Sequence, residues 1–330
     1  MPRLIVTDYT FPTLEVEHRR LDPLGITVEG IKSGERAELL ARLRAADFVL
    51  TQFANLDAEA IECMDKAQVI VRYGIGVDNV DLEAARDRGI PVCNVPDYCI
   101  DEVADHTLAL ILSATRRVVE NANYVRSGKW GLPVPVDAMR CLKSMTVGVI
   151  GFGRIGREVA SRLMPFKCRI LVSDPGVTAA EVEEAGCELT VLENLLVNSD
   201  VVTLHCPSSP ATRRLLNADS IDAMKPGAIL INVARGNVVD TTAMVEGLKS
   251  GKIGFAALDV LDPEPPPEGH PVLTMSNVIL HSHIASASGE AVLKLRSDAA
   301  AIIALAFEGR PLPNIVNGVA VPGRGAVAIS

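Results

Sequence analysis

The fold of this chain is decided by the stretch Val147-Gly-Val-Ile-Gly151-Phe-Gly153-Arg-Ile-Gly156. A short apolar run with the character of a buried strand leads directly into glycines spaced as GxGxxG, and a helical pattern follows as far as Leu163. The glycine string alone is a weak signal, but strand, glycine-rich turn and helix in this order open a βαβ unit. Gly151 permits the tight turn, and Gly156 lets the helix pack close to the strand.

The same turn indicates a binding site for a dinucleotide. Because Gly153 has no Cβ, the backbone there can approach a pyrophosphate, and the helix that follows offers free N–H groups and its positive dipole end. The next strand ends at Asp174, 18 positions after Gly156 (174 − 156). A carboxylate there can accept both ribose hydroxyls and repel a 2′-phosphate, which favours NAD over NADP. Asp174 before Pro175 is also typical of a residue that only caps a turn.

Alternating strands and helices extend from this unit in both directions, which predicts parallel sheets. The length of 330 residues exceeds the size at which single cores stop growing, so we expect two domains. The expected strands are Leu4–Val6, Phe48–Leu50, Val69–Val71, Val92–Asn94, Val147–Ile150, Ile170–Ser173, Val201–Leu204, Ile229–Asn232, Ala256–Asp259 and Val278–Leu280. The expected helices include Glu35–Arg44, Leu82–Arg88, one long helix over Asp101–Arg126, and Glu290–Glu308.

Composition limits the function classes. The formal net charge is −9, which argues against nucleic acid as a partner, because phosphates demand a basic surface. The seven cysteines are scattered without a CxxC pair, as expected for free thiols in a reducing cytoplasm. The sequence contains no secretory signal pattern and no uninterrupted apolar run long enough for a membrane span.

Three groups of polar residues follow predicted strands of the second half, at the sheet edge where ligands of open α/β sheets bind. Arg235 can hold a carboxylate by a fork of hydrogen bonds and polarise a neighbouring keto oxygen. A histidine can exchange a proton with a hydroxyl near neutral pH, and His281 and His283 both qualify by spacing. Glu264 can orient the imidazole ring. We therefore expect chemistry on a small 2-hydroxy or 2-keto acid, with no metal required.

From Arg72 to Ile284 the chain resembles the D-isomer-specific 2-hydroxyacid dehydrogenase family. This family includes phosphoglycerate dehydrogenases, glyoxylate/hydroxypyruvate reductases, D-lactate dehydrogenases and the C-terminal-binding-protein corepressors. The matching strings are Arg72-Tyr-Gly-Ile-Gly-Val-Asp-Asn-Val-Asp81, Asp101-Glu-Val-Ala-Asp-His-Thr-Leu-Ala-Leu110, Gly151 to Glu158, Leu204-His-Cys-Pro207, Lys225-Pro-Gly-Ala228, Asn232 to Asp240, Ala257-Leu-Asp-Val260 and Ser282-His-Ile284.

The resemblance implies a set of site residues. It makes Arg235, Glu264 and His283 the catalytic residues and so decides for His283 over His281. The implied substrate-binding residues are Tyr73, Gly74, Ile75 and Gly76, through backbone N–H groups, with Arg235 and His283. The implied cofactor contacts are Thr107, Gly151, Gly153, Arg154, Ile155, Gly156, Asp174, His205, Pro207, Thr212, Val233, Ala234, Arg235, Asp259 and His283. Arg72 and Tyr73 are candidates for contacting the distal end of the substrate.

The family fold comprises two doubly wound parallel-sheet α/β domains. The resemblance implies a Rossmann-type NAD-binding domain of residues 101–285, inserted in a flavodoxin-like substrate domain of residues 1–100 and 286–330. It also implies a homodimer formed through the cofactor domain, with Asp101–Arg126 near the contact.

The implied function is hydride transfer between NAD and a small D-2-hydroxy or 2-keto acid of the phosphoglycerate, glyoxylate/hydroxypyruvate or D-lactate type. An NAD(H)-sensing binding protein like the corepressors is the alternative, since those proteins keep the same triad. Phosphite dehydrogenase is a minor alternative. The family's formate enzymes carry Gln where this chain has Glu264, which argues against formate. Ser282 stands where a Pro commonly precedes the catalytic histidine, so the pocket shape is left open.

Overall fold

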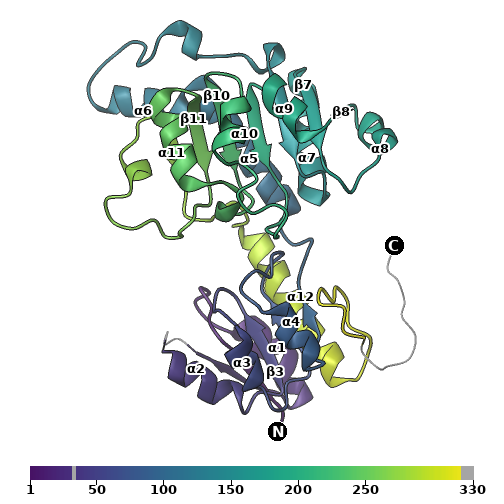
Figure 1. The fold of residues 1–330 in the computed structure, drawn as a ribbon. Coiled ribbons are helices and arrows are strands. Elements are labelled where there is room, and N and C mark those ends of the chain that lie inside the picture. Colours follow the sequence, from purple (N-terminus) through teal and green to yellow (C-terminus); the bar gives the residue numbers. More distant parts are fainter. Residues whose placement is uncertain (32–34, 321–330) are drawn as a thin grey trace. The chain divides into compact units, whose positions relative to one another are not determined.

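Two parallel sheets organise the chain, one in each of two units (Figure 1). The computed structural model describes residues 1–31 and 35–320. One unit comprises Cys99–Ala287, and the other comprises Met1–Tyr98 with the chain from Ser288 onward. The predicted range 286–330 ends in residues 321–330, which lie outside the described residues. The strand orders belong to the doubly wound class, so the α/β architecture predicted from the sequence is confirmed.

The sheet of Cys99–Ala287 is built outward from its centre. From β6 the chain runs through β7 to β8 and then crosses to β9 on the other side of β6, giving the order β12-β11-β10-β9-β6-β7-β8 with parallel neighbours. This order reverses between β6 and β9, the point at which open α/β sheets bind ligands. The strands are β6 (Thr146–Ile150), β7 (Arg169–Ser173), β8 (Glu188–Leu189), β9 (Val201–Leu204), β10 (Ala228–Asn232), β11 (Ile253–Leu258) and β12 (Val278–Leu280).

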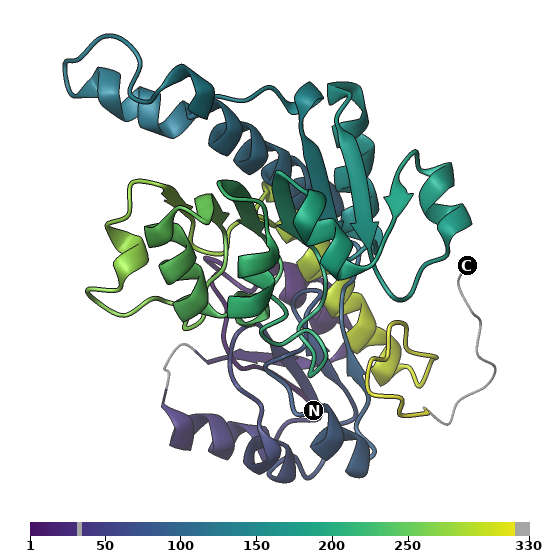
Figure 2. The ribbon, with the colours of Figure 1, turned by 45° about the horizontal axis from the view of Figure 1, so that its top comes forward.

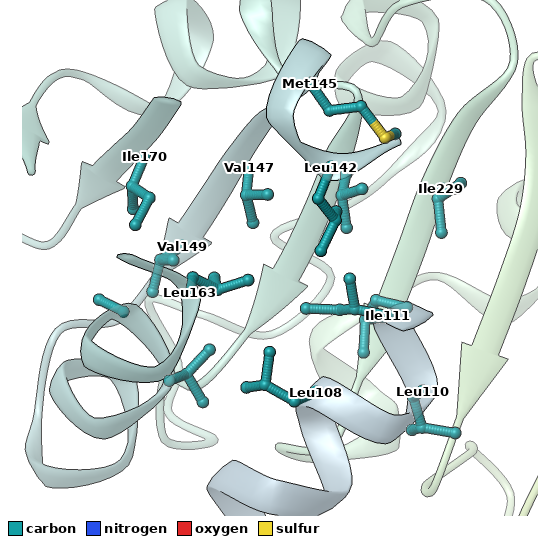
Figure 3. Packing of buried hydrophobic residues seen from close by; sticks show 14 of the residues in the cluster. Leu108, Leu110, Ile111, Leu142, Met145, Val147, Val149, Leu163, Ile170 and Ile229 are labelled. Atoms are coloured by element: carbon teal, nitrogen blue, oxygen red, sulfur yellow. The ribbon is translucent and has the colours of Figure 1, made fainter. Parts of the chain in front are cut away.

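Alternate residues of β6 face opposite sides of this sheet. Val147 and Val149 belong to the buried cluster shown in Figure 3, where Leu108 from α5 (Ile100–Arg116) also lies. On the other side, a Cβ at Gly148 would lie 2.4 Å from Leu195 Cδ2. Glycine at 148 therefore lets α9 approach the strand closely. The other α-helices of this unit are α6 (Val118–Arg126), α7 (Arg154–Leu163), α8 (Ala179–Glu184), α9 (Leu192–Asn198), α10 (Ala218–Ala223) and α11 (Thr241–Ser250).

The prediction of one continuous helix over Asp101–Arg126 is wrong. Arg117 adopts the left-handed conformation with φ 54° and separates α5 from α6. Its guanidinium lies 4.5 Å from the ring centroid of Phe255, and its Nη1 is 3.3 Å from Glu120 Oε2. These contacts stabilise Arg117 in the conformation that separates the two helices. The hydrophobic periodicity of the sequence could not reveal this separation, because the apolar spacing continues on both sides of Arg117. Among the helices that the structure describes, none is both long enough and apolar enough to cross a bilayer.

The other sheet has the order β2-β1-β3-β4-β5, again with parallel neighbours, which is the flavodoxin-like order. The sequence did not predict β2, because this edge strand buries only Val28 and so shows little apolar pattern. The elements are β1 (Arg3–Val6), β2 (Thr27–Gly30), β3 (Phe48–Thr51), β4 (Ile70–Arg72), β5 (Val92–Cys93), α1 (Glu15–Leu21), α2 (Arg36–Leu43), α3 (Ala58–Glu62), α4 (Leu82–Asp87) and α12 (Gly289–Phe307).

A buried ion pair joins α1 to α12 in this unit. Glu17 is fully buried, and Arg296 donates to it from Nε at 2.9 Å and from Nη2 at 2.6 Å. The Tyr73 hydroxyl donates to the same carboxylate at 2.9 Å, and burial raises the pKa of this phenol well above its usual range, which keeps it a donor. The carboxylate is therefore compensated by one cation and one neutral donor.

Removing the cation should leave an uncompensated charge in this core. We expect Arg296→Met to lower the free energy of unfolding by about 3 to 5 kcal/mol, measured by urea denaturation. Glu188→Gln is the matched control, because it breaks the exposed Arg169–Glu188 pair and should cost less than about 1 kcal/mol. Equal losses in the two variants would contradict the assignment.

Candidate active site

The glycine-rich turn after β6 has the geometry that a dinucleotide requires. Gly151 has φ +91°, and a Cβ there would lie 2.6 Å from the backbone nitrogen of Cys206. A Cβ at Gly156 would lie 2.1 Å from the carbonyl oxygen of Gly151, so the start of α7 packs directly on the turn. At Gly153 an added Cβ would meet nothing within 4 Å, which leaves the turn open on that side. A phosphate can approach the backbone there.

The N-terminus of α7 is free for an anion. Its N-cap is Gly153, which makes no side-chain cap hydrogen bond, and its first turn contains no acidic residue. By contrast, α8, α11 and α12 have side-chain N-caps. The side chains of Thr178, Asp240 and Ser288 accept hydrogen bonds from backbone N–H groups in the first turns of these helices. The first N–H groups of α7 and its positive dipole end are therefore available to the phosphates of a cofactor.

Asp174 caps the turn after β7, and its carboxylate keeps acceptor capacity that a ribose could use. It follows β7, and its Oδ2 accepts from the N–H of Phe152 at 2.6 Å while its Oδ1 accepts from the N–H of Gly176 at 2.7 Å. These bonds fix the carboxylate beside the glycine-rich turn. Each carboxylate oxygen can accept a further hydrogen bond, so the ribose hydroxyls can still bind. The residues present fit NAD.

His283 and Glu264, which the sequence predicts to be an acid/base pair, lie in contact. Their Nδ1 and Oε1 atoms lie 2.8 Å apart, and both side chains are partly exposed. Contact between Nδ1 and the carboxylate orients the imidazole ring. His281 instead places its Nδ1 2.9 Å from Nε2 of His106, whose pKa is lowered by burial. The two histidines therefore differ in their partners: His283 contacts a carboxylate and His281 contacts another imidazole. Their spacing in the sequence did not show this difference.

A buried aspartate fixes the turn that presents His283. His283 has φ 58°, a left-handed conformation that costs a non-glycine residue roughly 1 to 2 kcal/mol. Asp259 is 1% exposed; its Oδ1 accepts from the N–H of Ile284 at 2.8 Å and its Oδ2 from the N–H of Ala285 at 2.9 Å. The backbone oxygen of Asp259 also accepts from the N–H of His283. Sequence reasoning gave Asp259 only a cofactor contact and missed this positioning role.

Arg235 lies after β10 in a turn that Asn232 holds. The Asn232 side chain donates to the backbone oxygen of Arg235 at 2.9 Å and accepts from the N–H of Ala234 at 3.0 Å. A Cβ at Gly236 would lie 2.0 Å from the carbonyl carbon of Leu261, so this position demands glycine. The guanidinium Nη1 donates to the backbone oxygen of Ala234. Sequence reasoning did not assign Asn232 this function, although the Asn-Val-Ala-Arg-Gly string contained the signal.

Three of the predicted cofactor contacts, His205, Thr212 and Thr107, already have hydrogen-bond partners within the protein. His205 Nε2 lies 2.9 Å from Thr203 Oγ1, and burial lowers the pKa of His205 to about 3, so its imidazole is neutral. Thr212 Oγ1 donates to the backbone oxygen of Pro207 at 2.6 Å and closes the loop between them. Thr107 is fully buried, and its hydroxyl donates to the oxygen of Val103 within α5. The hydroxyl of Thr107 is therefore already bonded inside its own helix.

The loop after β4, in the other unit, has two backbone amides that are not used. The side chain of Tyr73 is 1% exposed and lies in the core, so it is not placed to contact the distal end of a substrate. The N–H groups of Tyr73 and Gly74 donate to backbone oxygens, and Asn94 holds the oxygen of Ile75 at 2.6 Å. Within residues 1–31 and 35–320, the N–H groups of Ile75 and Gly76 donate to no protein acceptor.

The Rossmann strand order and the open glycine-rich turn define a dinucleotide-binding protein. Residues 108–285 match the family model described as "D-isomer specific 2-hydroxyacid dehydrogenase, NAD binding domain". The chain therefore belongs to the D-isomer-specific 2-hydroxyacid dehydrogenase family, and its cofactor is NAD.

Named relatives agree with this membership. The chain is 40% identical over 286 residues to glyoxylate reductase of Thermofilum pendens, covering 86% of this chain and 84% of that protein. It is 37% identical over 295 residues to D-3-phosphoglycerate dehydrogenase of Archaeoglobus fulgidus, covering 89% of this chain but only 55% of that protein. The chain thus spans about half the length of that dehydrogenase. A solved structure of D-lactate dehydrogenase from Aquifex aeolicus, in complex with NAD and lactic acid, has a TM-score of 0.85 at 27% identity, covering 93% of this chain and 96% of that one.

Replacing Asp174 should relax the preference for NAD. In Asp174→Ala the charge and the acceptors for ribose are lost, so we expect NADH to bind about tenfold more weakly while NADPH binds more tightly. Fluorescence titration of both cofactors measures the ratio. Asp174→Asn keeps an acceptor without the charge, and it should relieve the repulsion of NADPH with a smaller loss of NADH. A wild-type ratio in both variants would place the discrimination elsewhere.

Proposed function

We propose that this protein catalyses reversible hydride transfer between NAD and the carbinol carbon of a small D-2-hydroxy acid, with the 2-keto acid as the oxidised product. The observation that carries the proposal is the 2.8 Å contact between His283 Nδ1 and Glu264 Oε1. A carboxylate that binds one ring nitrogen sets the tautomer and the orientation in which the other nitrogen exchanges a proton.

In the oxidation direction, we assign the hydroxyl proton of the substrate to His283 Nε2. Bound NAD⁺ would accept the hydride that leaves the carbon bearing this hydroxyl, so that one hydride and one proton (two electrons and two protons in all) are removed and a carbonyl forms. Glu264 holds the imidazole and stabilises the imidazolium. Reduction of the keto acid reverses each transfer, with His283 returning the proton to the carbonyl oxygen.

Arg235 gives the proposal its substrate class. Its guanidinium can bind the carboxylate beside the reacting carbon and polarise the carbonyl. The family resemblance also assigns carboxylate binding to the loop after β4, where the amides of Ile75 and Gly76 donate to no acceptor among the described residues. We keep these amides in the proposal as anion donors. The similarity to glyoxylate reductase and D-3-phosphoglycerate dehydrogenase makes glyoxylate, hydroxypyruvate and phosphoglycerate the first substrates to test.

A panel of keto acids and hydroxy acids tests the reaction directly. We expect NADH oxidation, followed by its absorbance, with at least one small 2-keto acid. His283→Ala should lower turnover by about 10²- to 10⁴-fold while NADH binding stays near wild type, because only the proton transfer is lost. His281→Gln removes the neighbouring imidazole and should lose less than about tenfold. No turnover across the panel, with tight NADH binding, would favour an NAD(H)-sensing binding protein instead.

We also propose that the protein forms a homodimer through the Cys99–Ala287 unit. α6 and the segment after it project from the sheet of this unit (Figure 2). They expose large apolar side chains, including Val118 at 52%, Trp130 at 91% and Val136 at 68%. Apolar side chains gathered on one projecting segment are typical of an interface.

Negative charges on the apolar surface formed by α6 and the segment after it should prevent dimerisation. We expect the double variant Val118→Asp/Trp130→Asp to elute as a monomer in size-exclusion chromatography with light scattering, where the wild type elutes as a dimer. Val191→Asp is the matched control, because Val191 is also exposed in this unit but lies at the start of α9. A monomeric wild type would contradict the proposal.

All seven cysteines are free, and four of them are buried. This pattern supports the further proposal of a reducing, cytoplasmic location.

A further inference from the structure

A cluster of two histidines and one aspartate lies beside the His283 turn, and its two histidines have no part in the proposed reaction. Within residues 1–31 and 35–320, the ligand atoms of His106, Asp259 and His281 all lie within 4.8 Å of one another. His106 Nε2 is 2.9 Å from His281 Nδ1 and 3.9 Å from Asp259 Oδ1. The two imidazole rings meet edge to face at 69°.

The sheet itself brings these residues together. Asp259 follows Leu258 of β11, and His281 follows Leu280 of β12, and these two leucines are register partners in neighbouring parallel strands. The N–H of His281 donates to the oxygen of Leu258 at 2.8 Å, which continues the ladder to the cluster. The third member, His106, comes from α5. The positions are thus set by strand pairing and a long helix, not by a mobile loop.

We propose that His106, His281 and Asp259 bind a divalent transition-metal ion such as Zn²⁺. This proposal goes beyond the dehydrogenase function and is independent of it. Bond lengths of about 2.0 to 2.2 Å place the ligand atoms of a tetrahedral Zn²⁺ about 3.3 Å apart. The two imidazole nitrogens, 2.9 Å apart, would have to separate slightly, and Asp259 Oδ1, 3.9 Å from His106 Nε2, would have to approach. From the sequence we expected no metal, because the predicted catalysis needs none; the proposed ion would take no part in the hydride transfer.

The donor set selects the class of ion. Two imidazole nitrogens and one carboxylate oxygen suit Zn²⁺, Co²⁺ or Ni²⁺, whereas Mg²⁺ and Ca²⁺ prefer oxygen donors alone. The carboxylate is already oriented, because the N–H groups of Ile284 and Ala285 hold both of its oxygens. Three protein ligands leave a fourth position for water or another ligand. The ion would be tied through Asp259 to the backbone that carries His283.

Co²⁺ is the probe of choice because its tetrahedral complexes absorb visible light. Untagged protein, freed of metal by a chelator and without NAD, should bind one Co²⁺ per chain and develop d–d absorption that Zn²⁺ abolishes. Zn²⁺ should also raise the melting temperature, since an ion that binds only the folded state stabilises it. His106→Gln and His281→Gln should each weaken binding by about 100-fold or more and lose both signals.

Two controls separate this site from other histidines. His18→Gln removes an exposed imidazole that pairs with one carboxylate, Asp22, and it should bind Co²⁺ as the wild type does. His283→Gln should also keep the signal, since His283 pairs with Glu264. Circular dichroism checks that each variant is folded. For the wild type, anomalous diffraction from crystals grown with Zn²⁺ should place the ion between His106 and His281.

Other results would overturn the proposal. These are the absence of saturable Co²⁺ binding by the wild type, unchanged binding in folded His106→Gln and His281→Gln, or an anomalous peak at other residues. Because these readouts need neither NAD nor substrate, they stand even if the keto-acid panel shows no turnover. A failed panel and a failed metal site are therefore distinguishable.

Discussion

The buried carboxylate of Asp259 holds the backbone on which the proposed chemistry depends. Its oxygens accept from two consecutive N–H groups, and its own carbonyl accepts from His283. Three hydrogen bonds thus converge on a turn whose left-handed residue would otherwise relax. With the turn fixed, the imidazole can meet Glu264 at 2.8 Å. A rigid support of this kind keeps the imidazole oriented by Glu264, as the proposed proton transfer requires.

Parallel pairing explains why so many polar groups meet at one edge of the larger sheet. The turns after β6, β7, β9, β10, β11 and β12 all leave from the carboxyl ends of their strands, so each adds side chains to the same edge. The strands add few polar side chains to this edge, among them Asn232 at the end of β10 and Thr203 of β9. The sheet therefore sets the positions of the segments that follow its strands, and the residues of these segments supply most of the functional groups.

The parts of the fold that could be predicted from sequence are those encoded locally. The spacing of Gly151, Gly153 and Gly156 can be recognised within six residues, and β6, β7, β9, β10, β11 and β12 are formed by largely apolar runs, whereas β8 (Glu188–Leu189) is too short and polar to be predicted. Sequence could not pair Arg296 with Glu17, 279 positions away, because neither residue carries a local sign of its partner. It also could not separate His281 from His283 by spacing, since that difference arises from strand pairing and the position of α5.

The uncapped start of α7 has a consequence for how the protein behaves before NAD binds. Within the described part of the chain the first turn of α7 has no side-chain cap, so it receives less internal support than the start of a capped helix. Cofactor phosphates supply the missing acceptors. Part of the binding free energy is thus consumed in ordering this turn, and hydrogen exchange at its amides would slow as the cofactor saturates the protein.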